Sequence, residues 1–142
     1  MTPEDEKQFI AGHRLCIVGH ERQAGPPALS PVYYVLDGDD ILISTQADRA
    51  KARAIQRNPE VSLCILDENP PFPYVTVFGT GRIESEGAAE LMMRVGEAIS
   101  GKPVPESGRA AIEERARREQ RVVLRVTPVS TFATGPRARP KE

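Results

Sequence analysis

Apolar residues recur along this chain with two different periods, and the period predicts where strands and helices lie. Alternation with a period of two, or a short unbroken apolar run, is typical of strands, whereas spacings of three and four are typical of amphipathic helices. Strands are predicted over residues 15–19, 28–36, 41–45, 61–66, 74–83 and 121–126, with 130–133 as a candidate extension, and helices over 3–12, 47–57, 86–100 and 109–119. The pattern predicts a mainly β protein with helices.

Turn residues and helix ends predict how these elements connect. Asp37-Gly38-Asp39-Asp40 is a hairpin signal, so the strand at 41–45 is expected to pair back onto the strand before it. Thr2 is expected to cap the first helix, and Asn58-Pro59 to end the helix at 47–57. The chain has no βαβ series and no Gly-x-Gly-x-x-Gly loop, which argues against a Rossmann fold. These connections predict a six-stranded antiparallel barrel with helices packed around it.

Length and charge narrow the classes of function. The 142 residues are expected to form a single domain over 1–134, followed by a disordered tail over 135–142. Nineteen Lys and Arg residues balance 20 Asp and Glu residues, which argues against a nucleic-acid partner. No run approaches the ~20 apolar residues of a membrane span, and the polar, acidic N-terminus is unlike a signal peptide. We therefore expect a soluble, cytoplasmic protein without a membrane partner.

Residues that could perform catalysis or hold a metal are sparse. Cys16 and Cys64 lie inside apolar runs and are expected to be buried, reduced thiols, while His13 and His20 are isolated in sequence. No metal site is predicted, because no Cys-x-x-Cys or combined His and Cys spacing occurs. No nucleophile or acid–base pair is evident either, so no catalytic residue is assigned. An enzyme of this kind leaves the difficult chemistry to a cofactor.

The candidate chemistry lies between residues 44 and 51. Ser44 and Thr45 end a predicted strand, and the helix that follows carries Arg49 and Lys51 near its N-terminus. Hydroxyl groups, a helix N-terminus and two early cations together favour an anion. This segment predicts a phosphate pocket for a bound cofactor.

A helical wheel that starts at Ala47 distinguishes the cations of this helix. Ala50 and Ala54 share the packing face with Ala47, and Lys51 flanks that face, from where its ammonium can reach the strand end. Arg53 points toward water. The alternative for Lys51 is a surface lysine whose alkyl stem covers apolar surface.

Two other positions have alternative interpretations that the sequence leaves open. Thr45 and Asp48 form a Thr-x-x-Asp pattern, so the Thr45 hydroxyl could serve only to cap the helix. Because glycine has no side chain, Gly79 and Gly81 leave one patch of the longest predicted strand without side chains. That arrangement suits either a tight bend of the barrel or a flat ligand lying against the sheet.

Several short strings, taken in order, resemble one family. They are Ser30-Pro31-Val32-Tyr33-Tyr34, Asp37-Gly38-Asp39, Ile43-Ser44-Thr45, Arg49-Ala50-Lys51-Ala52, Arg57-Asn58-Pro59-x-Val61-Ser62-Leu63-Cys64 and Tyr74-Val75-x-Val77-x-Gly79. They resemble the pyridoxamine-phosphate-oxidase-like split β-barrel superfamily, over about residues 5–134. Within it, the strings are most similar to the deazaflavin (coenzyme F-420)-dependent oxidoreductases.

The resemblance implies a split β-barrel of the FMN-binding type that forms a homodimer, with two cofactor sites at the subunit interface. The cofactor ring would lie along the second, third and fifth predicted strands. By position, the cofactor phosphate would be held by Ser44, Thr45, Arg49 and Lys51. The ring would lie along Pro31, Val32 and Tyr34, with Gly79 on the fifth strand beneath it.

The resemblance also implies an oxidoreductase that transfers a hydride from reduced F-420 to an unsaturated small molecule, whose identity the sequence does not give. Flavin-binding oxidases of the superfamily typically carry an arginine on the second strand, and residues 30–36 contain none. Phe132 stands where many relatives have a larger aromatic residue. These departures favour F-420 over FMN. The alternatives are an FMN-dependent oxidoreductase of the same fold and a non-enzymatic protein that binds F-420 or a flavin.

Overall fold

The computed structural model describes residues 1–135, so the predicted disordered tail, apart from Gly135, lies outside the described residues. The helices are α1 (Pro3–Ala11), α2 (Ala50–Arg57), α3 (Ala88–Ser100), the short 3-10 helix η1 (Glu106–Gly108) and α4 (Arg109–Arg118). The strands are β1 (Leu15–His20), β2 (Ala28–Tyr33), β3 (Val35–Asp37), β4 (Asp40–Gln46), β5 (Glu60–Leu66), β6 (Tyr74–Glu84) and β7 (Arg121–Thr134).

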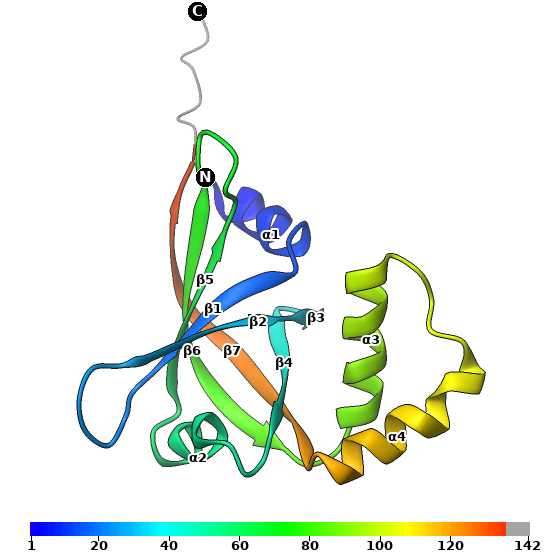
Figure 1. Ribbon diagram of the computed structural model, residues 1–142. Coiled ribbons are helices and arrows are strands. Elements are labelled where there is room, and N and C mark those ends of the chain that lie inside the picture. Colours follow the sequence, from blue (N-terminus) through cyan, green and yellow to red (C-terminus); the bar gives the residue numbers. More distant parts are fainter. Residues whose placement is uncertain (136–142) are drawn as a thin grey trace, which may run out of the picture.

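The strands form one antiparallel sheet in the order β2-β1-β5-β6-β7-β4-β3 (Figure 1). The sheet curls so far that β2 approaches β4, although these two strands are not hydrogen-bonded neighbours in it. The result is a half-barrel with a split between β2 and β4. The predicted class, a mainly β split barrel with helices, is therefore confirmed. The predicted number of strands was wrong, because the sheet has seven instead of six.

The additional strand arises because the predicted strand at 28–36 divides at Tyr34. The backbone N–H of Tyr34 donates to the carbonyl of Arg14 at 2.9 Å, and the Tyr34 hydroxyl donates to the carbonyl of Ile10 at 2.7 Å. Before this residue the chain pairs with β1, and after it the chain pairs with β4. The predicted hairpin is therefore limited to β3 and β4, around a turn in which Gly38 has φ of 59°.

The core fills the inside of the curled sheet. Alternate residues of the strands point inward and are fully buried, among them Val18, Ile43, Leu63, Val77 and Leu124. A smaller cluster lies under α3, and α2 closes one end of the barrel (Figure 1). No helix in residues 1–135 is long and apolar enough to cross a membrane.

Both cysteines are free thiols, as the sequence predicts. Cys16 is fully buried, as predicted, whereas Cys64 is only partly buried. Burial raises the pKa of the Cys16 thiol to about 12, which keeps it protonated and unreactive at neutral pH.

Candidate functional site

A cleft of about 470 Å³ lies in the split between β2 and β4, next to the start of α2. We call it the anion cleft, and the lining residues that matter here are Ser30, Val32, Ser44, Thr45, Arg49, Lys51 and Arg121. The cleft forms because β2 and β4 are not hydrogen-bonded to each other, which leaves side chains of both strands facing a common space. It brings together all four residues that the sequence predicts for a phosphate, and Val32 as well.

Two hydroxyl groups in the anion cleft have unused hydrogen-bonding capacity. Ser30 Oγ on β2 and Ser44 Oγ on β4 are buried side-chain atoms with no hydrogen-bond partner within residues 1–135. Buried polar groups are nearly always paired, and leaving one unpaired costs about 1–3 kcal/mol. Both hydroxyls are therefore positioned to bond a ligand. Sequence reasoning did not assign Ser30, because only the fold brings β2 opposite β4.

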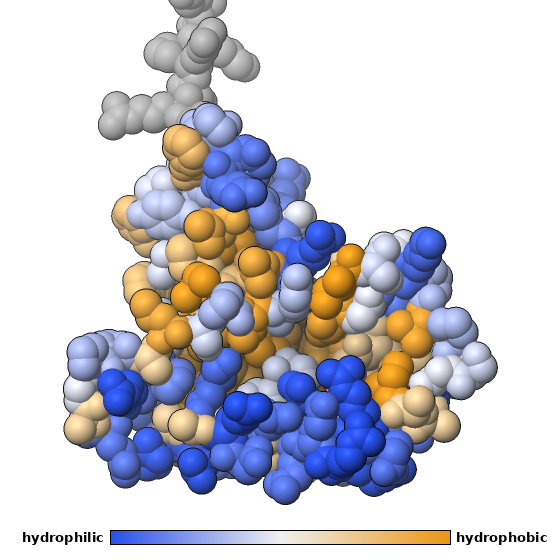
Figure 2. All heavy atoms as spheres, in the orientation of Figure 1, coloured by the Kyte–Doolittle hydropathy of each residue, from blue (hydrophilic) through white to orange (hydrophobic). Residues whose placement is uncertain are grey.

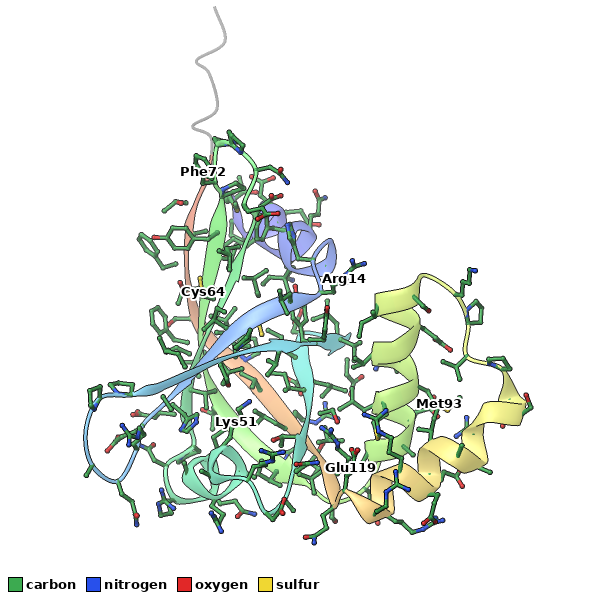
Figure 3. The ribbon with its side chains drawn as sticks, in the orientation of Figure 1. Arg14, Lys51, Cys64, Phe72, Met93 and Glu119 are labelled. Carbon is green, nitrogen blue, oxygen red and sulfur yellow. The ribbon has the colours of Figure 1, made fainter. Side chains whose placement is uncertain are left out.

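Lys51 provides a positive charge that no carboxylate within residues 1–135 neutralises. The side chain is partly buried, and this burial is the main reason why the pKa of Lys51 lies below its usual range. The neighbouring Cys16 thiol opposes the shift, and no Asp or Glu contributes to it. Figure 3 shows Lys51 extending from α2 toward the strands above it. A partly desolvated ammonium group in this position favours an anionic ligand.

The start of α2 differs from the sequence prediction. The helix begins at Ala50 with Arg49 as its N-cap, and no side chain caps it. Thr45 therefore does not cap the helix, which removes the alternative in which its hydroxyl serves only as a cap. The chain before Ala50 forms a turn instead, held by a hydrogen bond of 2.8 Å from the Ala47 N–H to the carbonyl of Gln120. The first N–H groups of α2 are left for a ligand.

The later start also changes which face of α2 packs against the barrel. Ala52, Ala54 and Ile55 are buried, whereas Ala47 and Ala50, which the helical wheel placed on the packing face, are exposed. Arg53 is exposed, as predicted. Arg49 is exposed at the edge of the anion cleft, where its Nε donates to Gln46 Oε1 at 2.5 Å. The guanidinium group is thus oriented by Gln46.

Three residues predicted to contact the cofactor ring lie outside the anion cleft. Pro31 is exposed on β2, where the outward-facing residues alternate with Ser30 and Val32. Tyr34 is 2% exposed, and burial raises the pKa of its hydroxyl, so it belongs to the core. Gly79 lines a neighbouring cleft instead.

Gly79 occupies a position that leaves no room for a side chain. A Cβ atom added there would lie 2.7 Å from the carbonyl oxygen of Thr127 and 2.9 Å from Val126 Cγ1. The register between β6 and β7 also shifts at this point. The glycine is therefore explained by the close approach of β6 and β7, a structural reason that is nearer to the tight-bend interpretation than to the flat-ligand one.

The described residues offer no evident metal site. Within residues 1–135, no group of three or more His, Cys, Asp or Glu side chains is placed to hold a metal ion. The donors around the anion cleft include hydroxyls, cations and helix N–H groups, which suit a phosphate. The fold and the cleft together describe a split-barrel protein with a cleft lined by hydroxyls and cations.

The comparison with protein families agrees with this description. The family model described as pyridoxamine 5'-phosphate oxidase matches residues 2–135. The chain belongs to this family.

Solved structures with the same fold differ in the ligands for which they are named. The chain is similar to the conserved hypothetical protein Rv2991 from Mycobacterium tuberculosis, with 20% identity, a TM-score of 0.83, and coverage of 100% of this chain and 93% of that one. An F420 reductase matches with 20% identity, a TM-score of 0.73, and coverage of 92% and 98%. An FAD-binding protein from Mesorhizobium loti matches with 12% identity, a TM-score of 0.65, and coverage of 94% and 92%. A search among curated proteins finds no significant match.

Proposed function

We propose that this protein is an oxidoreductase that uses reduced coenzyme F-420 to reduce an unsaturated small molecule. The observation that supports the proposal most strongly is the convergence of two unpaired hydroxyls, Ser30 Oγ and Ser44 Oγ, with the Lys51 ammonium in the anion cleft. A cofactor phosphate satisfies all three groups at once.

The residues of the anion cleft have distinct tasks in this proposal. Lys51 and Arg49 neutralise the phosphate, and charge-assisted contacts of this kind are the stronger hydrogen bonds. Ser30 and Ser44 donate their hydroxyl hydrogens to it from the two sides of the split. The uncapped start of α2 adds backbone N–H donors and the favourable end of its dipole. Thr45 and Val32 complete the wall.

The chemistry itself belongs to the cofactor. When bound, reduced F-420 would supply the hydride for an electron-poor carbon of a substrate double bond, water would supply the proton for the neighbouring atom, and the cofactor would be left oxidised. This chain contributes binding and orientation. Holding two planar molecules face to face can account for up to ~7–11 kcal/mol of the barrier in the best cases.

Two observations favour F-420 over FMN. Residues 30–36, at the split, contain no arginine for a flavin phosphate. An F420 reductase is among the structures with this fold, and it spans nearly the same length. An FAD-binding protein also shares the fold, so FMN remains the second candidate, and a non-enzymatic F-420 or flavin carrier the third.

Titration of the purified protein with F-420 and, separately, with FMN, followed by absorbance, tests the cofactor. We expect F-420 to bind with micromolar or better affinity and FMN more weakly. Turnover of reduced F-420 with a panel of enones, quinones and tetrapyrroles then distinguishes an enzyme from a carrier. Preferential binding of FMN would contradict the proposal, and binding of F-420 without turnover of any acceptor would favour the carrier.

The same proposal includes a homodimer. The outer face of β2, β5, β6 and β7 exposes large apolar side chains, with Leu29, Leu66, Phe78 and Phe132 between 45% and 73% exposed. Figure 2 shows apolar surface gathered on this side of the sheet. A second copy of the chain is its proposed occupant, because a patch of this kind on a small protein favours self-association. Light scattering at micromolar concentration should give twice the chain mass.

The proposal also places the protein in the cytoplasm. The free thiols of Cys16 and Cys64 are consistent with this location.

A further inference from the structure

A second cleft adjoins the anion cleft and differs from it in chemistry. This cleft, of about 340 Å³, lies between α3 and the strands β2 and β4, and we call it the α3 cleft. Its apolar wall consists of Val32, Tyr33, Met92, Val95 and Ile99, and Arg115 and Arg121 lie at one end. Val32, Ser44 and Arg121 line both clefts, so the two clefts are direct neighbours.

The charged end of the α3 cleft has an excess of one positive charge. Glu119 is the carboxylate between the two arginines: its Oε2 lies 2.8 Å from Arg121 Nε, and its Oε1 lies 3.1 Å from Arg115 Nε. Hydrogen bonds from Arg121 and then from Arg115 lower the pKa of Glu119, so it is ionised at neutral pH. Two guanidinium groups therefore share one carboxylate. Arg121 is the less exposed of the two, at 22% against 54% for Arg115.

We propose that the α3 cleft is the substrate site and that its substrate is an apolar molecule with a single carboxylate. The apolar wall removes the body of such a molecule from water, and Arg121 binds its carboxylate through the donors that Glu119 does not use. The volume and the few polar groups are typical of small-molecule sites. That the ligand is the substrate rests on the proposed function, since only a cofactor in the anion cleft makes the neighbouring site a place of reaction.

A fluorescent probe tests the ligand class on the cofactor-free full chain. Anthracene-9-carboxylate is an apolar monocarboxylate, and anthracene-9-methanol is its uncharged counterpart. We expect the carboxylate to bind saturably and more tightly than the alcohol. Arg121→Gln should weaken carboxylate binding by about tenfold or more and leave binding of the alcohol unchanged. Arg117→Gln removes an equal charge from α4 outside the cleft, where Arg117 pairs with Glu114, and should change neither affinity.

A second pair of variants separates the α3 cleft from the apolar outer face of the sheet. Ile99 is 46% exposed, so a polar residue there should not prevent folding. Ile99→Glu places a negative charge in the cleft and should weaken carboxylate binding more than Ile99→Gln does. Equal binding in wild type, Arg121→Gln and Ile99→Glu would overturn the proposal, and so would a failure of the carboxylate to bind.

Addition of F-420 to the probe complex distinguishes this inference from the proposed function. We expect F-420 and anthracene-9-carboxylate to bind together, each with little effect on the other. Displacement of the probe by F-420 would overturn the substrate site and assign the α3 cleft to the cofactor. Probe binding that depends on Arg121, together with no binding of F-420, would support the ligand class of the cleft while refuting the proposed function.

Discussion

Arg125 Nη1 lies 2.8 Å from Asp37 Oδ2, an ion pair that fastens the β3–β4 hairpin to β7. The same guanidinium also contacts Asp40 Oδ2 at 3.1 Å and Glu84 Oε1 at 2.8 Å. One arginine therefore joins the two residues that flank the hairpin turn to the end of β6. Because β4 provides Ser44 and Thr45, this cluster helps to fix the strand that forms one wall of the anion cleft.

The cluster predicts how stability depends on acid. The hydrogen bond from Arg125 is the largest cause of the lowered pKa of Glu84. A carboxylate with a lowered folded-state pKa stabilises the protein above its unfolded pKa, and the contribution is lost as pH falls through the folded pKa. We expect urea unfolding to show a larger loss of stability between pH 5 and pH 3 for wild type than for Glu84→Gln, by at most ~1 kcal/mol.

Glu86→Gln is the matched control for this prediction, since Glu86 is exposed two residues further along the chain. Its pH dependence should follow that of wild type. Identical acid sensitivity in wild type and Glu84→Gln would show that the ion pair does not contribute to stability.

Ser44→Ala should affect the free protein and the cofactor complex in opposite directions. In the free protein the substitution removes a buried hydroxyl without a partner, so the melting temperature should stay constant or rise. In the complex it removes a hydrogen bond to the phosphate worth about 0.5–1.5 kcal/mol, which weakens the affinity by about two- to thirteenfold. Differential scanning fluorimetry with and without F-420 measures both effects. The exposed Ser85→Ala should change neither.

Lys51→Ala tests the main positive charge of the site. Loss of a charge-assisted contact worth ~1.5–3 kcal/mol should reduce F-420 affinity about ten- to a hundredfold, with little change in melting temperature. Arg53→Ala removes a charge from the exposed side of the same helix and should have no effect. Unchanged affinity in Lys51→Ala would refute the phosphate assignment.

The lowered pKa of Lys51 predicts a pH dependence of binding. Burial disfavours its charged form, so Lys51 loses its proton at a lower pH than an ordinary lysine with pKa 10.5. Cofactor affinity should therefore fall as pH rises through the folded-state pKa, while the stability of the free protein rises over the same interval. Lys51→Arg stays protonated and should keep its affinity to a higher pH. Titrations of both proteins from pH 7 to pH 10 check this, and parallel curves would contradict it.

The sequence predicts the features that depend on neighbouring residues. Thr2 caps α1 as expected, the chain turns at Gly38, and α2 ends before Asn58. Ser44 and Lys51 could be assigned to one site for the same reason, because a strand end and a helix start lie close together in the chain.

The features that the sequence missed depend on contacts between distant segments. Tyr34 divides a strand because its hydroxyl and N–H bond to carbonyl groups some 20 residues earlier in the chain, at Ile10 and Arg14. Ser30 reaches the anion cleft only because the sheet curls until β2 faces β4. The late start of α2 follows from a bond between Ala47 and Gln120. Local pattern contains no signal for any of these three contacts.

Gly79→Val decides between the two interpretations of the glycines in β6. If the close approach of β6 and β7 is the reason for Gly79, a valine side chain collides with the Thr127 backbone, which cannot move without disturbing the ladder. Overpacking of this kind costs ~1–3 kcal/mol, so the melting temperature should fall even without cofactor. Thr80→Val, at the exposed neighbouring position, introduces the same side chain and should be tolerated. A Gly79→Val protein with wild-type stability and no affinity for F-420 would instead indicate that Gly79 lies against the cofactor ring.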